Sequence, residues 1–125
     1  MDFRRLLQSF KDAINGVKYV FSNEQNFRIQ VYLAIFVLIL ISILGLRNSE
    51  IIIIILMIAI VLILELLNSA LEKFADLLKP RLSVQIQIIK DILAAMVFLS
   101  SIVAIIIGSI ILWPYFFRIL VGMVL

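Results

Sequence analysis

Three long apolar segments constrain this chain more than any other feature of its sequence. The first covers residues 29–46, the second starts at Ile51 and stays apolar as far as Leu64, and the third covers 92–113 without a charged residue. As helices, the first and third would extend about 27 and 33 Å, close to the hydrocarbon thickness of a bilayer. We therefore predict an all-α membrane protein with spanning helices over 29–46, 51–79 and 90–113, the second bearing charge beyond Leu64.

The composition supports a membrane location and restricts the chemistry. Hydrophobic residues make up 65% of the chain and charged residues 15%, with a mean hydropathy of +1.24, far from the values of a soluble domain. Cysteine and histidine are absent, which excludes disulfides, zinc sites and catalysis by Cys or His side chains. The net charge of +3 is small for a nucleic-acid binder and favours lipid head groups or phosphates as partners, although ordinary positive-inside charge explains individual basic residues as well.

The N-terminal segment 1–26 has the pattern of an amphipathic helix. Its apolar residues recur at steps of three and four, and it contains no continuous apolar run of the kind found in a cleavable signal peptide. We predict a helix that lies on the membrane surface. The alternative, a helix packed on a soluble domain, is weaker because no soluble domain follows, and we treat 1–125 as a single domain. The apolar residues of this helix are Phe3, Leu6, Leu7, Phe10, Ile14, Val17 and Phe21.

Short polar segments and prolines mark the expected ends of the spanning helices. Residues 47–50 form a polar turn, Pro80 marks the end of the second helix, and Pro114 is expected to stop the third. The apolar stretch 119–125 is too short to span. Lys and Arg number five before the first span, one between the first two, four from Lys73 to Lys90, and one after the third. The positive-inside rule then predicts that the N-terminus and the second loop face the cytoplasm.

The second spanning helix carries an organised polar face at its predicted cytoplasmic end. At about 100° per residue, five polar residues occupy an arc of only about 100°. Carboxylates near hydrocarbon are costly unless they are compensated, so such a face predicts a functional site. Glu65 lies deepest, directly after the apolar run, where a carboxylate is a usable proton acceptor. The five residues are Glu65, Asn68, Ser69, Glu72 and Asp76.

Three charged residues outside this face are further candidates. Lys90 and Asp91 begin the third span, where they offer a cation for phosphate beside a second polar group or, alternatively, a simple interfacial anchor. Glu24 lies where the surface helix meets the first span, and it is the acid there that could complete a metal site with the second helix. The alternative for Glu24 is an exposed loop charge.

This set of groups is suited to phosphoryl transfer. That reaction needs Mg²⁺ to draw charge off the triphosphate, cations around the transferred group and an acceptor for the proton of the attacking hydroxyl. Carboxylate and amide oxygens suit Mg²⁺. The four glycines are isolated, so neither a P-loop nor the glycine-rich loop of protein kinases is present.

The polar residues also resemble a known family. Residues 65–76, Glu65-Leu-Leu-Asn-Ser-Ala-Leu-Glu72-Lys-Phe-Ala-Asp76, are followed by Lys90-Asp91-Ile-Leu-Ala-Ala95 and preceded by Asn23-Glu24-Gln-Asn-Phe27-Arg28. These motifs resemble those of the prokaryotic diacylglycerol kinase and undecaprenol kinase family, over roughly 5–113. The resemblance implies a homotrimer with a surface helix and three spans per subunit, active sites shared between neighbouring subunits, and a location in the bacterial cell membrane with the site facing the cytoplasm.

The resemblance also implies roles for individual residues. It makes Glu65 the general base with Asn68 in support, and Glu24 and Glu72 the Mg²⁺ ligands. Asp12 and Ile29 depart from the pattern, since some relatives carry an aromatic residue and a glutamine there. The implied nucleotide contacts are Arg5, Asp12, Glu24, Glu72, Asp76, Lys90 and Asp91, and the implied lipid contacts are Glu65, Phe27 and Arg28.

The function expected from residues and resemblance together is an ATP-dependent lipid kinase. It transfers the γ-phosphate to the primary hydroxyl of diacylglycerol, giving phosphatidic acid, or of undecaprenol, giving undecaprenyl phosphate. One alternative is a small oligomeric transport or proton-conducting protein in which Glu65 carries the ion, but the acids cluster at one end and form no path across the bilayer. Another is a non-enzymatic assembly subunit, which would leave the polar face unexplained.

Overall fold

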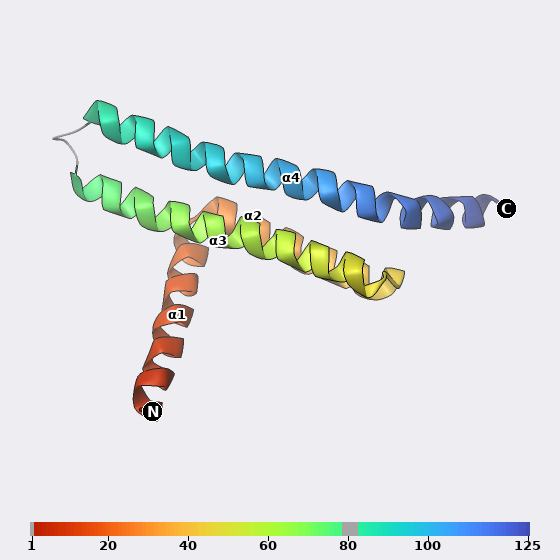
Figure 1. The fold of residues 1–125 in the computed structure, drawn as a ribbon, viewed down its shortest axis with the longest axis horizontal. Coiled ribbons are helices and arrows are strands. Elements are labelled where there is room, and N and C mark those ends of the chain that lie inside the picture. The colour runs from red at the N-terminus through yellow and green to blue at the C-terminus, as the bar shows by residue number, and fades with distance from the viewer. Residues whose placement is uncertain (1, 79–82) are drawn as a thin grey trace.

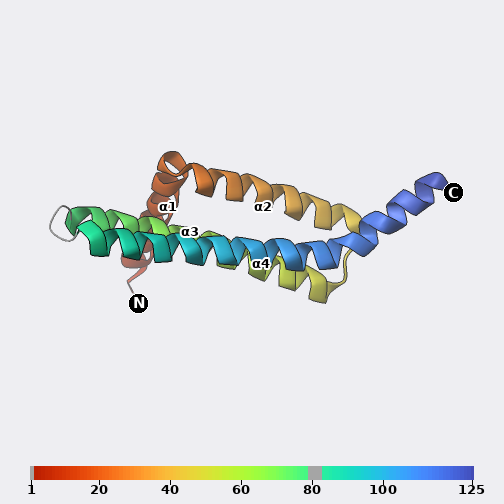
Figure 2. The same ribbon diagram turned by 90° about the horizontal axis from the view of Figure 1, so that it is seen from above.

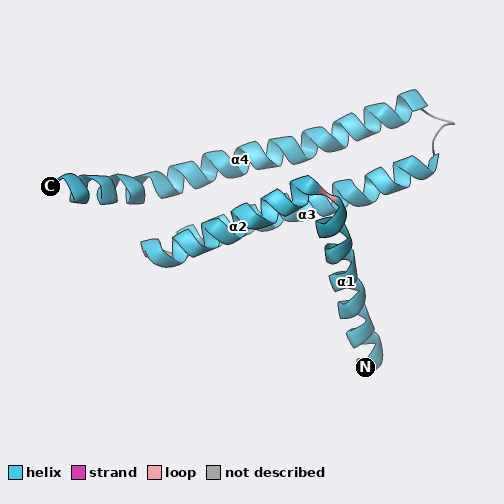
Figure 3. Ribbon diagram, turned by 180° about the vertical axis from the view of Figure 1, so that it is seen from behind, coloured by secondary structure: helices cyan, strands magenta, loops and turns pink. Residues whose placement is uncertain are grey.

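The computed structural model describes residues 2–78 and 83–125, and these residues form four helices. In chain order they are α1 (Phe3–Asn23), α2 (Gln25–Leu44), α3 (Asn48–Leu78) and α4 (Ser83–Val124). The described residues contain no strand, and Figure 3 shows nearly all of them as helices. The prediction of an all-α chain is confirmed.

Three of the helices are long and apolar enough to cross a membrane, namely α2, α3 and α4. They run side by side in Figures 1 and 2, with α3 packed most extensively against α4 and less against α2. The 20 residues of α2 extend about 30 Å, which matches a bilayer. The 31 residues of α3 extend about 46 Å, so part of α3 must project beyond the hydrocarbon.

Helix α1 leaves the other three at a steep angle, as Figure 1 shows. Glu24 breaks the helical path with an extended backbone (φ −113°, ψ 111°), and α2 begins at the next residue. The Nη1 group of Arg28 donates to the carbonyls of Phe21 and Ser22, both at 2.9 Å, which satisfies carbonyl groups that the end of a helix leaves unpaired. A side chain of α2 thereby fixes the corner between α1 and α2. The location of α1 on a membrane surface stays a prediction.

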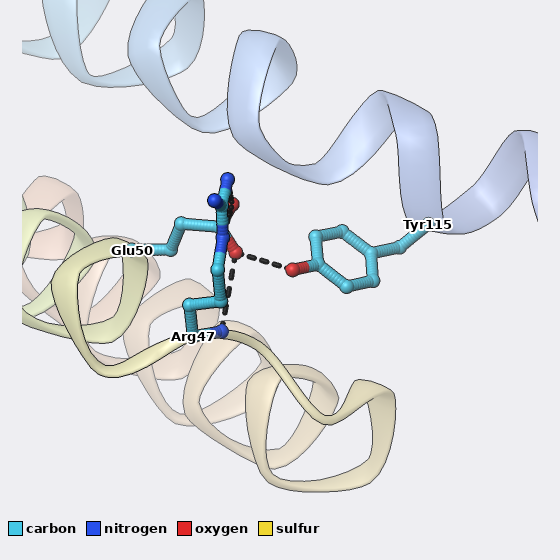
Figure 4. A network of polar contacts seen from close by, with 3 residues as sticks. All are labelled: Arg47, Glu50 and Tyr115. Carbon is cyan, nitrogen blue, oxygen red and sulfur yellow. Dashed lines mark hydrogen bonds and ion pairs between the residues drawn. The ribbon is translucent and has the colours of Figure 1, made fainter.

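The opposite end of the bundle is closed by a polar network (Figure 4). Gly45, with φ 66°, ends α2 in the left-handed conformation that glycine adopts readily. The Arg47 guanidinium then donates to Glu50 at 2.9 Å, and the Tyr115 hydroxyl of α4 donates to the same carboxylate. A small core of Ile41, Leu46 and Ile54 lies beside this network. The α2–α3 connection is thus tied to α4, far along the chain.

The predicted stop of the third span at Pro114 is wrong. Helix α4 contains Pro114 and continues to Val124, and Figure 2 shows its last turns bent away from the rest. A proline inside a helix removes one hydrogen bond and causes a kink, but the residues after it can resume the helix. The apolar stretch 119–125 therefore mostly extends α4. The helix also begins at Ser83, ahead of the predicted residue 90, while the predicted end at Lys79 and Pro80 lies outside the described residues.

Candidate active site

The polar face of α3 is graded from buried to exposed. Glu65 is 2% exposed and Ser69 is 4% exposed. Asn68 and Glu72 are half-buried, and Asp76 is exposed. The exposure of these side chains therefore increases from Glu65 towards the C-terminal end of α3, and Glu65 is the most enclosed carboxylate of the face.

Glu65 has a partner on the neighbouring helix α2. The Nε2 group of Gln30 donates to its Oε2 atom at 3.2 Å. Gln30 was not among the predicted site residues. Its signal in the sequence was a lone amide near the start of an otherwise apolar segment, and such a residue also fits a surface position at a membrane boundary.

A hollow of about 670 Å³ lies against Glu65, between α2, α3 and α4. We call it the polar pocket. Its described lining includes the carboxylates Glu65, Glu72 and Asp91 and no lysine or arginine. The carbonyl oxygens of Asn68 and Gln30, both in this lining, are buried and have no hydrogen-bond partner among the described residues. The remaining lining residues are Asn26, Ile29, Ala94, Ala95, Val97, Phe98 and Ser101. A pocket with this lining is suited to cations and to hydrogen-bond donors.

A second hollow of about 480 Å³ adjoins the polar pocket, and we call it the apolar pocket. Gln30 and Ser101 line both pockets, so these two residues mark the junction. The other walls are almost entirely hydrocarbon side chains from the same three helices, such as Val37, Ile58 and Leu112. An elongated apolar group in this pocket can therefore present a polar end to Glu65.

Glu24 belongs to the same electrostatic environment. Its carboxylate and that of Glu72 both interact with Glu65 through their charges, although Glu24 does not line the polar pocket. Within residues 2–78 and 83–125, no three acidic side chains lie close enough together to hold a metal ion by themselves.

An ion pair connects α3 and α4 near the exposed end of the polar face. The Nζ atom of Lys90 on α4 lies 2.6 Å from Oδ1 of Asp76 on α3. Gln87 donates to Asp91 at 2.9 Å. Two predicted nucleotide contacts, Asp76 and Lys90, thus pair with each other, while Asp91 faces the polar pocket.

The other predicted site residues lie away from both pockets. Arg5 and Asp12 are exposed on α1, where Arg5 is paired with Asp2 and Asp12 accepts from Gln8. Phe27 is 2% exposed and lines neither pocket. Arg28 is engaged with the end of α1, as described above. The fold of one chain therefore brings Glu65, Asn68, Glu72 and Asp91 together at the polar pocket. Arg5, Asp12, Phe27 and Arg28 lie outside it.

Two proteins of known name are similar in sequence to this chain. A protein named diacylglycerol kinase from Synechocystis sp. is 38% identical over 110 residues, 87% of this chain and 63% of that protein. A protein of the same name from Haemophilus influenzae is 41% identical over 71 residues, 57% of this chain and 60% of that protein. The aligned segments thus span less than two-thirds of each relative.

A family model also matches most of the chain. It is described as prokaryotic diacylglycerol kinase and matches residues 11–112, which include every predicted site residue except Arg5. The chain belongs to the prokaryotic diacylglycerol kinase family.

Proposed function

We propose that this membrane protein is a lipid kinase that transfers the γ-phosphate of ATP to the primary hydroxyl of a membrane lipid. The observation that carries the proposal is the junction of the two pockets at Gln30 and Ser101, beside the buried Glu65. A lipid whose tail occupies the apolar pocket has its head group at the polar pocket. Diacylglycerol and undecaprenol both meet this description, with phosphatidic acid and undecaprenyl phosphate as the respective products.

Glu65 is the general base of the proposed reaction. The lipid hydroxyl oxygen forms a bond to the γ-phosphorus, the bond from that phosphorus to the β–γ bridging oxygen breaks, and ADP leaves. The hydroxyl proton passes to Glu65, whose enclosed position beside the pocket junction suits this role. Asn68, with its unpaired carbonyl oxygen in the same pocket, supports the site by accepting a hydrogen bond from a bound group.

The residues present fit a bound Mg²⁺ ion. Phosphates are repelled by a pocket that contains three carboxylates and no described cation, unless a metal ion offsets the charge. Glu24 and Glu72 would hold the ion, and phosphate oxygens and water would complete its coordination, as is usual for Mg²⁺. When bound, Mg²⁺ draws negative charge off the triphosphate.

The nucleotide lies on the cytoplasmic side in this proposal, next to Asp76, Lys90 and Asp91. Lys90 lies next in sequence to the pocket-lining Asp91 and is paired with Asp76, and its ammonium group can attract phosphate. Arg5 and Asp12 contact the nucleotide through the projecting helix α1, and Phe27 and Arg28 support the lipid side by fixing the corner between α1 and α2. The protein resides in the bacterial cell membrane.

The test is a phosphorylation assay in mixed micelles. Purified protein is supplied with radiolabelled ATP, Mg²⁺ and either diacylglycerol or undecaprenol. We expect a labelled lipid phosphate from at least one acceptor and none without Mg²⁺. The parent protein should be shown to be folded by its helical circular dichroism. Folded protein that phosphorylates neither lipid would contradict the proposed function.

A homotrimer is the proposed assembly. None of the residues in the most apolar stretch of α4 is buried within the described chain. The small residues Ser100, Ala104 and Gly108 follow one another at steps of four along it, and Ser100 lines neither pocket. Small residues in this spacing let membrane helices approach closely. A neighbouring copy would also bring its α1, with Arg5 and Asp12, towards a site other than its own.

Chemical cross-linking in lipid bilayers tests the assembly. We expect a discrete band at three times the monomer mass, independent of the cross-linker concentration above saturation. Ser100→Leu should reduce this band because its side chain prevents close approach of another helix. A fully active protein that yields monomer alone would contradict the trimer.

A further inference from the structure

Gln30 makes one hydrogen bond within the described chain and leaves another group unused. Its Nε2 donates to Glu65 at 3.2 Å. Its Oε1 is buried and has no hydrogen-bond partner among the described residues. The same side chain lines both the polar and the apolar pocket. Gln30 is therefore in contact with the proposed general base and with the path between the two pockets.

The chemistry of the amide group decides which way Gln30 is turned. An ionised carboxylate accepts hydrogen bonds and cannot donate them, so Gln30 must present its N–H group to Glu65. The carbonyl oxygen is then directed away from Glu65. A buried carbonyl without a partner is unfavourable, so this oxygen selects a ligand that donates a hydrogen bond.

An alcohol has the donor that this position requires. Its O–H group can donate to Oε1 of Gln30, whereas an ester carbonyl or a hydrocarbon cannot. Because Oε1 and Nε2 share one carbon atom, a hydroxyl bound at Oε1 also lies near the Glu65 carboxylate. By rotation of its O–H bond, the hydroxyl can therefore donate to Glu65 in place of Gln30 while the lipid stays at the junction.

We infer that Gln30 is a positioning residue that receives the hydroxyl of the acceptor lipid at the pocket junction and holds Glu65 ready to accept its proton. This inference rests on the proposed lipid kinase function and adds a residue to it. Gln30 acts through hydrogen bonds alone, and no covalent bond to it forms or breaks.

The test compares the binding of two lipids without ATP, so it does not depend on catalysis. One is a short-chain diacylglycerol, and the other is its deoxy analogue, in which hydrogen replaces the hydroxyl group. For the parent protein we expect the alcohol to bind about tenfold more tightly, as one buried hydrogen bond allows. In Gln30→Met, which has a similar length but neither donor nor acceptor, this preference should fall below about twofold.

Gln85→Met is the matched control. It makes the same chemical change, but Gln85 is exposed on α4 and lines neither pocket, so the preference for the alcohol should persist. In turnover assays Gln30→Met should raise the KM for lipid and lower kcat, each by about tenfold, with the Kd for ATP within about twofold of the parent value. A merely structural role would not change the ratio between the two lipids.

Two outcomes would overturn the role of Gln30. One is an unchanged preference for the alcohol in Gln30→Met, and the other is an equal loss in Gln30→Met and Gln85→Met. If Gln30→Met does not fold, Gln30→Asn replaces it, since the shorter amide keeps both groups but cannot reach both partners, and an unchanged preference there has the same meaning. If the parent phosphorylates no lipid, the proposed function fails separately, because the binding comparison still reports on Gln30.

Discussion

Replacing Glu65 by glutamine is expected to lower lipid phosphorylation by about 10² or more while nucleotide affinity stays nearly unchanged. Glutamine keeps the shape of the side chain and part of its hydrogen bonding, including an acceptor for Gln30, but it cannot take up a proton. Glu65 is 2% exposed, so bulk water has poor access to replace it as a base. Radiolabelled lipid phosphate and ATP binding should be measured on the same preparation.

Glu50→Gln is the control for this experiment. It makes the same chemical change on the same helix, but Glu50 lies at the opposite end of α3, where it is bonded to Arg47 and Tyr115. Its turnover should stay within about twofold of the parent value. A transport function instead predicts that Glu65→Gln stops ion movement in liposomes and makes no statement about phosphorylation. Lipid phosphorylation by Glu65→Gln at the parent rate would show that Glu65 is not the base.

Replacing Glu24 or Glu72 by glutamine should impair metal and nucleotide binding instead. Each change removes one anionic oxygen ligand from the proposed Mg²⁺ site. We expect the Mg²⁺ concentration for half-maximal activity to rise at least about tenfold, the lower limit for losing even a supporting group of a metal site. Mg²⁺-dependent ATP binding should weaken in parallel, and the helices should remain inserted.

The metal prediction separates the acids by role. Excess Mg²⁺ should partly restore the activity of Glu24→Gln and Glu72→Gln by mass action, whereas it should not restore Glu65→Gln. Titration of ATP binding against Mg²⁺ for the three variants measures this difference. An unchanged Mg²⁺ dependence in both Glu24→Gln and Glu72→Gln would mean that other groups hold the metal.

Most of the fold could be predicted from the sequence because, in a membrane, the residues of each segment largely determine its own secondary structure. In hydrocarbon each backbone group must pair within its own helix, so an apolar run of sufficient length is a helix whatever its neighbours are. The segments 29–46 and 51–64 lie within α2 and α3 for this reason, apart from the last residues of the first, where Gly45 ends α2. The polar face from Glu65 to Asp76 was readable for a similar reason, since the helical period alone aligns its residues.

The tertiary structure alone decided which helices meet at that face. The bond between Gln30 and Glu65 joins residues 35 positions apart, and the polar pocket combines side chains of α2, α3 and α4. The pairing of Asp76 with Lys90 and the continuation of α4 through Pro114 were likewise absent from the sequence prediction. Helix formation depends on each segment's own residues, whereas the rotation and depth of one helix against another depend on side-chain packing between distant segments. The sequence by itself therefore determined the helices and the acidic face, and packing decided the partner of Glu65 and the junction at which a lipid can reach it.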